Sequence, residues 1–242
     1  GQTQLEEAGV ADAAIDAKEL YCFMMGYDKV ALMMHWQDVL QDNQCEVYFD
    51  LVQRRAQRTP LQHITGAQEF MGLSFKVNEN VLIPRQDTET LVEEALRVAK
   101  PGMRVLDLCT GSGCIIISLA KNVADISCTG SDISKQALLV AKENAKANEV
   151  EVEWERSDLF ENISGTFDLI VSNPPYIPTG EIPGLMPEVR DHEPRLALDG
   201  MSDGLYYYRS IVSQCRDYLK EDGALLFEIG AGQGAAVSEL LK

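Results

Sequence analysis

Residues 105–113 read VLDLCTGSG, a short apolar run that leads directly into a glycine-rich turn. The apolar run predicts a buried strand, and residues 114–120 continue as a predicted helix. Gly111 and Gly113 allow the backbone to approach a ligand closely or to take a positive φ, and the start of a helix offers free N–H groups. A strand, a glycine turn and a helix in this order predict a ligand-binding loop in an α/β fold.

Further strands are predicted downstream, and each is followed by polar residues at its carboxyl end. They cover residues 126–132, 152–156 and 167–172, with a helix predicted at about 134–148. Asp132 ends the first of these strands, at the distance from a glycine turn where a carboxylate suits a ribose with free hydroxyls. It could instead cap the helix that follows, because Asp132 and Ser134 are both capping residues.

The strand over 167–172 leads into Asn-Pro-Pro-Tyr at residues 173–176. Two prolines remove two backbone donors and stiffen the turn, so the Asn173 side-chain oxygen and the Pro174 carbonyl remain as acceptors. A rigid pair of acceptors beside the Tyr176 ring suits the binding of a planar NH2 group by both hydrogens. By itself the turn could be an ordinary proline-rich turn. The glycine turn upstream favours a ligand site, because open α/β sheets bind ligands at the carboxyl ends of their strands.

This order of elements resembles the class I S-adenosylmethionine-dependent methyltransferases, and separate blocks narrow the resemblance to the peptide chain release factor glutamine methyltransferases. The blocks are PLQHITG at 60–66, VLIPRQDTE at 81–89, NPPYI at 173–177, EPRLAL at 193–198 and LFEIG at 226–230. The resemblance extends from about residue 12 to residue 242. The chain departs from the family pattern at Cys109, where glycine is usual, and at Gln86, where proline is common. Because cysteine is small and often buried, we expect Cys109 to be tolerated with slightly altered packing of the loop.

The resemblance implies transfer of a methyl group from S-adenosyl-L-methionine, with S-adenosyl-L-homocysteine as product. The acceptor is the side-chain amide nitrogen of the glutamine in the Gly-Gly-Gln motif of peptide chain release factors. The implied catalytic residues are Asn173, Pro174 and Tyr176, and the substrate-binding residues are the same three with Pro175. The implied cofactor-binding residues are Cys109, Thr110, Gly111, Ser112, Gly113, Asp132, Asp158, Leu159 and Asn173.

Each implied role has a chemical reason. A glutamine nitrogen is a poor nucleophile, so acceptance of its two hydrogens by Asn173 and Pro174 would orient it toward the methyl group. Asp132 would accept hydrogen bonds from the ribose hydroxyls, and a carboxylate makes such bonds strongly. We expect Asp107 to support the glycine turn rather than to contact the ligand, and Glu228 is a further candidate to face the site. Asp158 and Leu159 would lie at the adenine.

Other functions remain open at this point. A related enzyme could modify a glutamine of a ribosomal protein, although residues 84–89 fit the release factor branch better. An adenine-N6 nucleic-acid methyltransferase would use the same turn to hold a flipped adenine against Tyr176. A nicotinamide-dependent oxidoreductase is disfavoured because Ile116 stands where the third glycine of the dinucleotide fingerprint is expected.

The charge balance disfavours nucleic acid as the substrate. The chain has 38 acidic and 21 basic residues and a formal net charge of −17, and a strongly acidic surface repels phosphate backbones. Arg54, Arg55 and Arg58 form the densest basic cluster. We expect them to stabilise the C-terminal end of a helix rather than to form a docking patch.

Cysteine usage and hydropathy indicate the cellular compartment in which the protein is expected. The six cysteines show no Cys-x-x-Cys spacing, and with only three histidines we predict no metal site. No apolar run of membrane-spanning length and no charged-then-apolar leader are found. We therefore expect reduced thiols in a cytoplasmic, monomeric protein without membrane or direct nucleic-acid partners.

The apolar spacing divides the chain into regions. Over residues 12–58 it is helical, and residues 68–83 read as a β-hairpin with strand segments at 69–71, 74–77 and 81–83. We predict an N-terminal helical substrate-recognition domain (1–66), a β-hairpin linker (67–84) and an S-adenosylmethionine-dependent methyltransferase domain (85–242). The fold class is α/β, with a Rossmann-like sheet. Because such sheets normally end with two further strands, we expect this domain to be incomplete at its C-terminal end, which would leave residues 224–228 as an edge strand.

Overall fold

The computed structural model describes all residues from 1 to 242 and divides into two compact units. The helical unit consists of Gly1–Gly66 together with Met186–His192. The sheet unit consists of Ala67–Leu185 and Glu193–Lys242. The predicted domain ranges did not assign residues 186–192 to the helical unit.

The helical unit is built around a small apolar core. Its helices are α1 (Gln2–Glu7), α2 (Ala13–Met25), α3 (Lys29–Met34), α4 (Asp42–Ala56), α5 (Leu61–Thr65) and α9 (Pro187–His192). Leu5, Leu20 and Val52 are fully buried in the core, and Ile64 of α5 joins them. Gly26 ends α2 in the left-handed conformation that suits a glycine helix cap. The helical pattern predicted for this region is confirmed.

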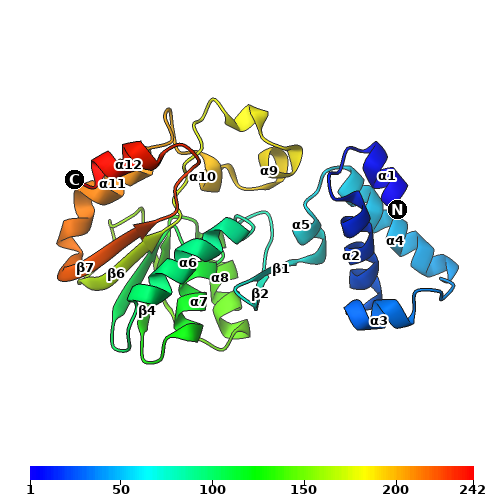
Figure 1. Ribbon diagram of the computed structural model, residues 1–242, viewed down its shortest axis with the longest axis horizontal. Coiled ribbons are helices and arrows are strands. Elements are labelled where there is room, and N and C mark those ends of the chain that lie inside the picture. Colours follow the sequence, from blue (N-terminus) through cyan, green and yellow to red (C-terminus); the bar gives the residue numbers. More distant parts are fainter. The chain divides into compact units, whose positions relative to one another are not determined.

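The sheet unit contains a five-stranded parallel sheet with the order β5-β4-β3-β6-β7 (Figure 1). The strands are β3 (Arg104–Leu108), β4 (Ser127–Asp132), β5 (Glu153–Arg156), β6 (Phe167–Ser172) and β7 (Leu219–Phe227). A separate antiparallel hairpin is formed by β1 (Ala67–Phe70) and β2 (Leu73–Lys76). The predicted fold class is therefore confirmed.

Helices cover both faces of the sheet because the central strands are apolar on both sides. In β3, Val105 packs in one core with α6 (Gln86–Val98), α7 (Cys114–Asn122) and α8 (Lys135–Ala147). These three helices lie in front of the strands in Figure 1. Leu106 and Leu108 belong to a second core that contains Ile211 of α11 (Tyr206–Gln214). The remaining helices are α10 (Arg195–Leu198) and α12 (Gly234–Leu240), with 3-10 turns at Ile182–Gly184 and Cys215–Asp217.

The segment that follows the hairpin differs from its prediction. Residues 81–83 are not a strand. Val81 and Ile83 are buried against Ala137 and Val140 of α8, so this apolar run packs as irregular backbone. A short apolar run predicts burial well but cannot by itself specify a strand. The edge strand expected at 224–228 overlaps β7, which starts earlier, at Leu219, ends at Phe227 and shows an irregularity in its pairing with β6.

None of the helices combines the length and the apolar character that a membrane crossing requires.

Asn144 of α8 joins the hairpin to the glycine turn. Its side chain is fully buried, its Oδ1 accepts from Lys76 N at 2.7 Å, and its Nδ2 donates to Lys76 O at 3.1 Å. Nδ2 also donates to Ser112 O at 2.9 Å. One amide therefore satisfies backbone groups of two segments that lie far apart in the sequence.

We expect Asn144→Ala to lower the free energy of unfolding of the sheet unit by about 3 kcal/mol, because it leaves buried backbone groups without partners. The measurement is urea denaturation followed by Trp154 fluorescence in a Trp36→Phe background, which leaves Trp154 as the single tryptophan. Asn122→Ala, an exposed change at the end of α7, serves as the control. Equal effects of the two variants would contradict this role for Asn144.

Candidate active site

The parallel register brings the polar residues after three strands to one edge of the sheet. Leu108, the last residue of β3, pairs with Ser131 of β4 and with Ser172 of β6. The residues that follow Leu108, Ser131 and Ser172 are Cys109, Asp132 and Asn173. Segments that are more than sixty residues apart in the sequence therefore meet at the carboxyl edge, where α/β sheets bind ligands.

A cavity of the sheet unit opens at this edge. Of the predicted site residues, its lining includes Cys109, Thr110, Gly111, Ser112, Asp132, Asp158, Leu159, Asn173 and Pro175. Gly113, Pro174 and Tyr176 are not among its lining residues. The structure thus gathers most of the predicted residues around one space and places the other three beside it.

The glycine turn has a backbone that only small residues adopt easily. Cys109, Gly111 and Gly113 have φ values of 59°, 54° and 81°. A Cβ on Gly113 would lie 2.8 Å from Ile117 Cδ1 and 3.1 Å from Trp154 Cη2, so these side chains would have to shift, and the φ of 81° strains any residue with a side chain. Gly113 therefore sets the packing of the turn on α7. Cys109 occupies a left-handed position despite its side chain, which explains why glycine suits the same place.

Asp107 supports the turn from below, as the sequence predicts. Its side chain is fully buried, and its Oδ2 accepts from Thr110 Oγ1 at 2.6 Å. Its Oδ1 has no hydrogen-bond partner. Burial raises the pKa of Asp107 to about 7, and the nearby Asp132 adds to the rise, whereas the Thr110 hydrogen bond opposes it. Asp107 is not among the residues that line the cavity.

Asp132 joins the turn to α8 and faces the cavity. Its Oδ2 accepts from Gly111 N at 2.9 Å, and its Oδ1 accepts from Ser134 N at 2.8 Å. The helix cap itself is Ser134, whose Oγ accepts from Ala137 N. Burial raises the pKa of Asp132, although the backbone hydrogen bonds oppose the rise. Each carboxylate oxygen keeps a further lone pair, so Asp132 can still accept hydrogen bonds from hydroxyl groups.

Thr88 orients the Asn173 amide. Asn173 Nδ2 donates to Thr88 Oγ1 at 3.4 Å, and Thr88 is buried in the first turn of α6. Because the NH2 group is directed to Thr88, the amide oxygen is the group left to accept from a ligand.

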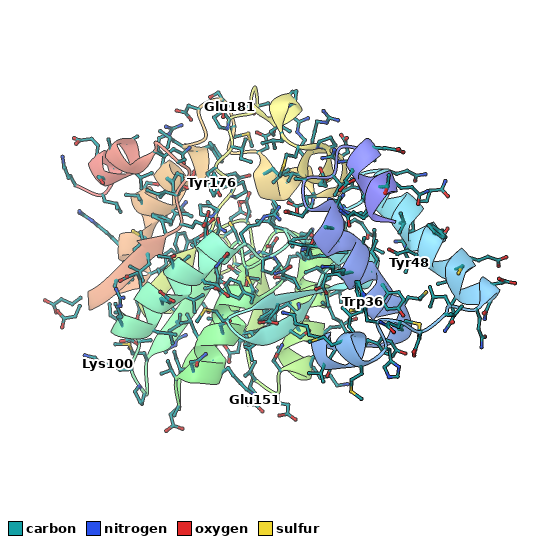
Figure 2. All side chains as sticks on the ribbon, turned by 45° about the vertical axis from the view of Figure 1, so that its right-hand side comes forward. Trp36, Tyr48, Lys100, Glu151, Tyr176 and Glu181 are labelled. Atoms are coloured by element: carbon teal, nitrogen blue, oxygen red, sulfur yellow. The ribbon has the colours of Figure 1, made fainter.

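The end of β7 holds Tyr176. The Tyr176 hydroxyl donates to Glu228 Oε1 at 3.3 Å, and its carbonyl accepts from Gln233 Nε2 at 3.0 Å. Gln233 is fixed in turn because its Oε1 accepts from Gly230 N at 3.0 Å. Burial and the Glu228 carboxylate raise the pKa of Tyr176 to about 12, so its phenol stays protonated. Burial also raises the pKa of Glu228. Tyr176 is labelled inside the sheet unit in Figure 2.

A loop over residues 199–204 supports the same turn from its other side. Gly200 N donates to Ile177 O at 2.8 Å. A Cβ on Gly204 would lie 2.3 Å from the Tyr176 carbonyl oxygen, and Gly204 has a φ of 72°. The turn therefore rests directly on backbone. Composition and spacing gave no signal for this contact.

Several lining residues were not assigned to the site from the sequence. They are Asn80, Val81, Leu82, Pro84, Ile133, Leu196, Ala197, Met201, Tyr206 and Tyr207, among others. Some belong to the blocks at 81–89 and 193–198 that carry the family resemblance, and this was the available signal. Tyr206 and Tyr207 start α11 and carried none.

Arg85 ties two of these blocks together. Its guanidinium donates to both oxygens of Glu193, at 2.6 and 2.8 Å, and the Glu193 side chain is only 1% exposed. Glu89 has a different partner, because its Oε1 accepts from Met71 N at 2.7 Å. Arg85 thus fixes the segment before the cavity residue Pro194, and Glu89 fixes the hairpin to α6.

Comparison with known proteins gives consistent relatives. A family model described as the PrmC N-terminal domain matches residues 1–66, and one described as the methyltransferase small domain matches residues 86–183. The release factor glutamine methyltransferase of Geobacter sulfurreducens is 46% identical over 234 residues, covering 96% of this chain and 82% of that protein. The protein of the same name from Clostridium acetobutylicum is 40% identical over 234 residues, covering 94% and 82%.

Solved structures share the fold at lower identity. A methyltransferase from Pyrococcus furiosus gives a TM-score of 0.53 at 14% identity and covers 84% of this chain and 86% of its own. SMU.776, crystallised as a complex with SAH, gives a TM-score of 0.52 at 15% identity and covers 70% and 43%. These similarities establish the methyltransferase fold of the sheet unit.

The raised pKa of Asp107 predicts a pH dependence of stability. The folded state binds a proton at Asp107 up to about pH 7, whereas the unfolded chain releases it near the ordinary value of 3.8. The free energy of unfolding therefore falls as the pH rises from about 4 to about 7. Relative to wild type, Asp107→Asn should gain about 2–4 kcal/mol in the free energy of unfolding across that range.

Urea denaturation at several pH values, again followed through Trp154, measures this difference. Glu153→Gln, a change at an exposed acid on β5, is the control and should show no such trend. A constant difference between Asp107→Asn and wild type at all pH values would refute the raised pKa.

Proposed function

This chain belongs to the release factor glutamine methyltransferases, and from this premise we propose how its site methylates a glutamine of a release factor. We propose that the acceptor is the side-chain amide nitrogen of the glutamine in the Gly-Gly-Gln motif. The observation that carries the proposal is the position of Asn173, which lines the cavity beside the glycine turn. The names of the relatives favour release factors over ribosomal proteins or nucleic acids as the substrate.

The residues at the cavity fit S-adenosylmethionine, which supplies an activated methyl group on a sulfonium. The turn over 109–113 offers a backbone free of bulky side chains. Asp132 offers carboxylate oxygens with spare lone pairs for the ribose hydroxyls. Ile133 and Leu159 give the lining an apolar part that suits the adenine. We assign the cofactor-binding role to the residues predicted from the sequence on this basis.

Asn173 and Pro174 act on the acceptor nitrogen. The lone pair of a carboxamide nitrogen is delocalised into its carbonyl, so the nitrogen attacks only when it is well oriented. Acceptance of its two hydrogens by Asn173 Oδ1 and the Pro174 carbonyl fixes that orientation. These acceptors also favour the positive charge that develops on the nitrogen as it bonds to the methyl carbon. The bond from the methyl carbon to the sulfonium sulfur breaks as the nitrogen bonds to that carbon, and the nitrogen would then release its extra proton to water.

The support behind the turn makes these acceptors rigid. Thr88 holds the Asn173 amide, and Glu228 and Gln233 hold Tyr176 at both its hydroxyl and its carbonyl. The Tyr176 ring then packs beside the glutamine amide plane. Positioning of this kind can lower a barrier by several kcal/mol without any acid or base.

We further propose that the helical unit recognises a part of the release factor away from the glutamine. The match of residues 1–66 to a separate family model supports an independent role for this unit. The six unpaired cysteines are consistent with a cytoplasmic protein. The net charge of −17 weighs against direct binding of nucleic acid. We expect the protein to act as a monomer.

A labelling experiment tests the function. The chain is incubated with methyl-labelled S-adenosylmethionine and, separately, with purified release factor, ribosomes, DNA or tRNA. We expect label only in the release factor, and mass spectrometry should locate it on the glutamine side chain. Label on nucleobases, or on a ribosomal protein alone, would reject the proposal.

Asn173→Ala should reduce kcat at least about a hundredfold, because one preorganised polar partner at a reacting centre contributes about 3–4 kcal/mol. The affinity for S-adenosylmethionine should change little, since other residues provide most of the cofactor contacts. Single-turnover kinetics measure the first quantity, and isothermal titration measures the second. A variant with normal turnover would remove Asn173 from the mechanism.

Asp132→Ala should weaken S-adenosylmethionine binding at least about tenfold, because charge-assisted hydrogen bonds to the ribose are lost. Isothermal titration gives the affinity, and Glu153→Ala on the neighbouring strand is a matched loss of an exposed carboxylate. Unchanged affinity in Asp132→Ala would show that the carboxylate serves only the turn and α8.

A further inference from the structure

The segment 186–192 belongs to a different unit from the residues on either side of it. Leu185 and Glu193 are part of the sheet unit, whereas Met186–His192 is part of the helical unit. The chain therefore passes between the units three times, after residues 66, 185 and 192. The helical unit is therefore joined to the sheet unit in two places. One is the link from Gly66 to the hairpin, and the other is the loop over residues 179–193, both ends of which lie in the sheet unit.

Ion pairs attach α9 to the helical unit. No residue of α9 is buried. Glu188 instead accepts from Arg58, with Nε 2.8 Å from Oε1 and Nη2 2.7 Å from Oε2. Arg55 adds a third contact, at 3.0 Å to Oε1. We call Glu188 with Arg55 and Arg58 the latch.

The latch is shielded from water and held from behind. The side chain of Arg55 is 9% exposed and that of Glu188 is 14% exposed. Arg55 Nε also donates to Asp16 Oδ2 at 2.7 Å, and Arg58 Nη1 donates to Gly9 O at 2.9 Å. Arg55 is therefore fixed by α2, and Arg58 by the turn that follows α1. The expectation that the arginine cluster only stabilises the end of a helix was incomplete, because two of its members hold acidic side chains.

The charged form of Glu188 is the stable one. Burial opposes its ionisation, but the hydrogen bonds from Arg58 and Arg55 and the charge of Arg55 outweigh burial and hold the pKa of Glu188 below its ordinary value. At neutral pH Glu188 is therefore the carboxylate that pairs with both arginines.

Both ends of the loop are anchored beside the active site. On the outgoing side, Thr179 N donates to Met201 O at 2.9 Å, and Met201 lines the cavity. On the return, Glu193 is held by Arg85 within 2.8 Å, one residue before the cavity residue Pro194. A loop fixed at both ends limits the movement of whatever is attached to its middle.

We propose that the latch makes Glu188 a positioning residue for the protein substrate. It restrains the helical unit, so that less freedom is lost when a release factor binds both units. The proposal rests on the proposed function. An alternative is that α9 only completes the fold of the helical unit. In that case Glu188→Gln should not raise KM for the release factor while leaving kcat unchanged.

The test compares Glu188→Gln in the full chain with wild type, using purified full-length release factor and S-adenosylmethionine. We expect KM for the release factor to rise at least about tenfold, because a restraint of about 1.4 kcal/mol or more is lost. We expect kcat and the affinity for S-adenosylmethionine to stay within about twofold, since the groups at the reacting atoms are unchanged. Glu188→Asp, which keeps the charge on a shorter arm, should give an intermediate KM.

Glu181→Gln is the matched control. It makes the same chemical change in the same loop, at an exposed side chain on the outer edge of the sheet unit (Figure 2). Its KM and kcat should equal those of wild type. An unchanged KM in Glu188→Gln, or a fall in kcat with KM constant, would overturn the latch.

Hydrogen exchange separates failure of the latch from failure of the proposed function. In Glu188→Gln the amides of 188–192 should exchange at least about tenfold faster, while those of α2 and α4 stay protected. Unchanged exchange in 188–192 would also overturn the latch, whether or not the release factor is methylated. If exchange in α2 and α4 rises as well, the helical unit has lost stability, and the KM of Glu188→Asp becomes the test. An intermediate KM supports the latch, and a KM equal to that of wild type overturns it. If the wild-type chain methylates no release factor, the proposed function is rejected. The hydrogen-exchange result still tests the latch in that case.

Discussion

The common register of three parallel strands is the constraint on which the rest of the site depends. Leu108 pairs with both Ser131 and Ser172, so the glycine turn, Asp132 and Asn173 leave the sheet at one level. None of these residues could form the site from a strand shifted by one position, because every side chain would then face the opposite side of the sheet. The apolar cores on the two faces fix this register, and the chemistry follows from it.

The turn that carries Asn173 and Tyr176 has little freedom of its own. Gln233 binds the Tyr176 carbonyl, Glu228 binds its hydroxyl, and Gly204 packs against the same carbonyl with no space for a side chain. In the proposed mechanism this support lets a site without a strong base methylate a carboxamide. There the oriented acceptors replace proton abstraction, and packing of the protein sets their orientation before any substrate arrives.

The sequence predicted the elements whose signals are local. Apolar runs that end in glycine or acidic residues predicted the strands, the glycine turn and the place of Asp132, and the proline pair marked the turn after β6. The signals failed where the structure depends on distant partners. Residues 81–83 read as a strand but pack on α8 as irregular backbone, and Glu188 meets Arg55 and Arg58 from 130 or more positions away. Ion pairs at that separation leave no periodic pattern, and the same is true of the contact between Gly204 and Tyr176.

The most direct measurement is a crystal structure of the chain with S-adenosylhomocysteine and a peptide that contains Gly-Gly-Gln. The account predicts that the glutamine nitrogen lies within about 3.2 Å of both Asn173 Oδ1 and the Pro174 carbonyl oxygen, with its free face toward the sulfur. A glutamine bound elsewhere in the cavity, or an Asn173 oxygen turned toward Thr88 and away from the peptide, would contradict it.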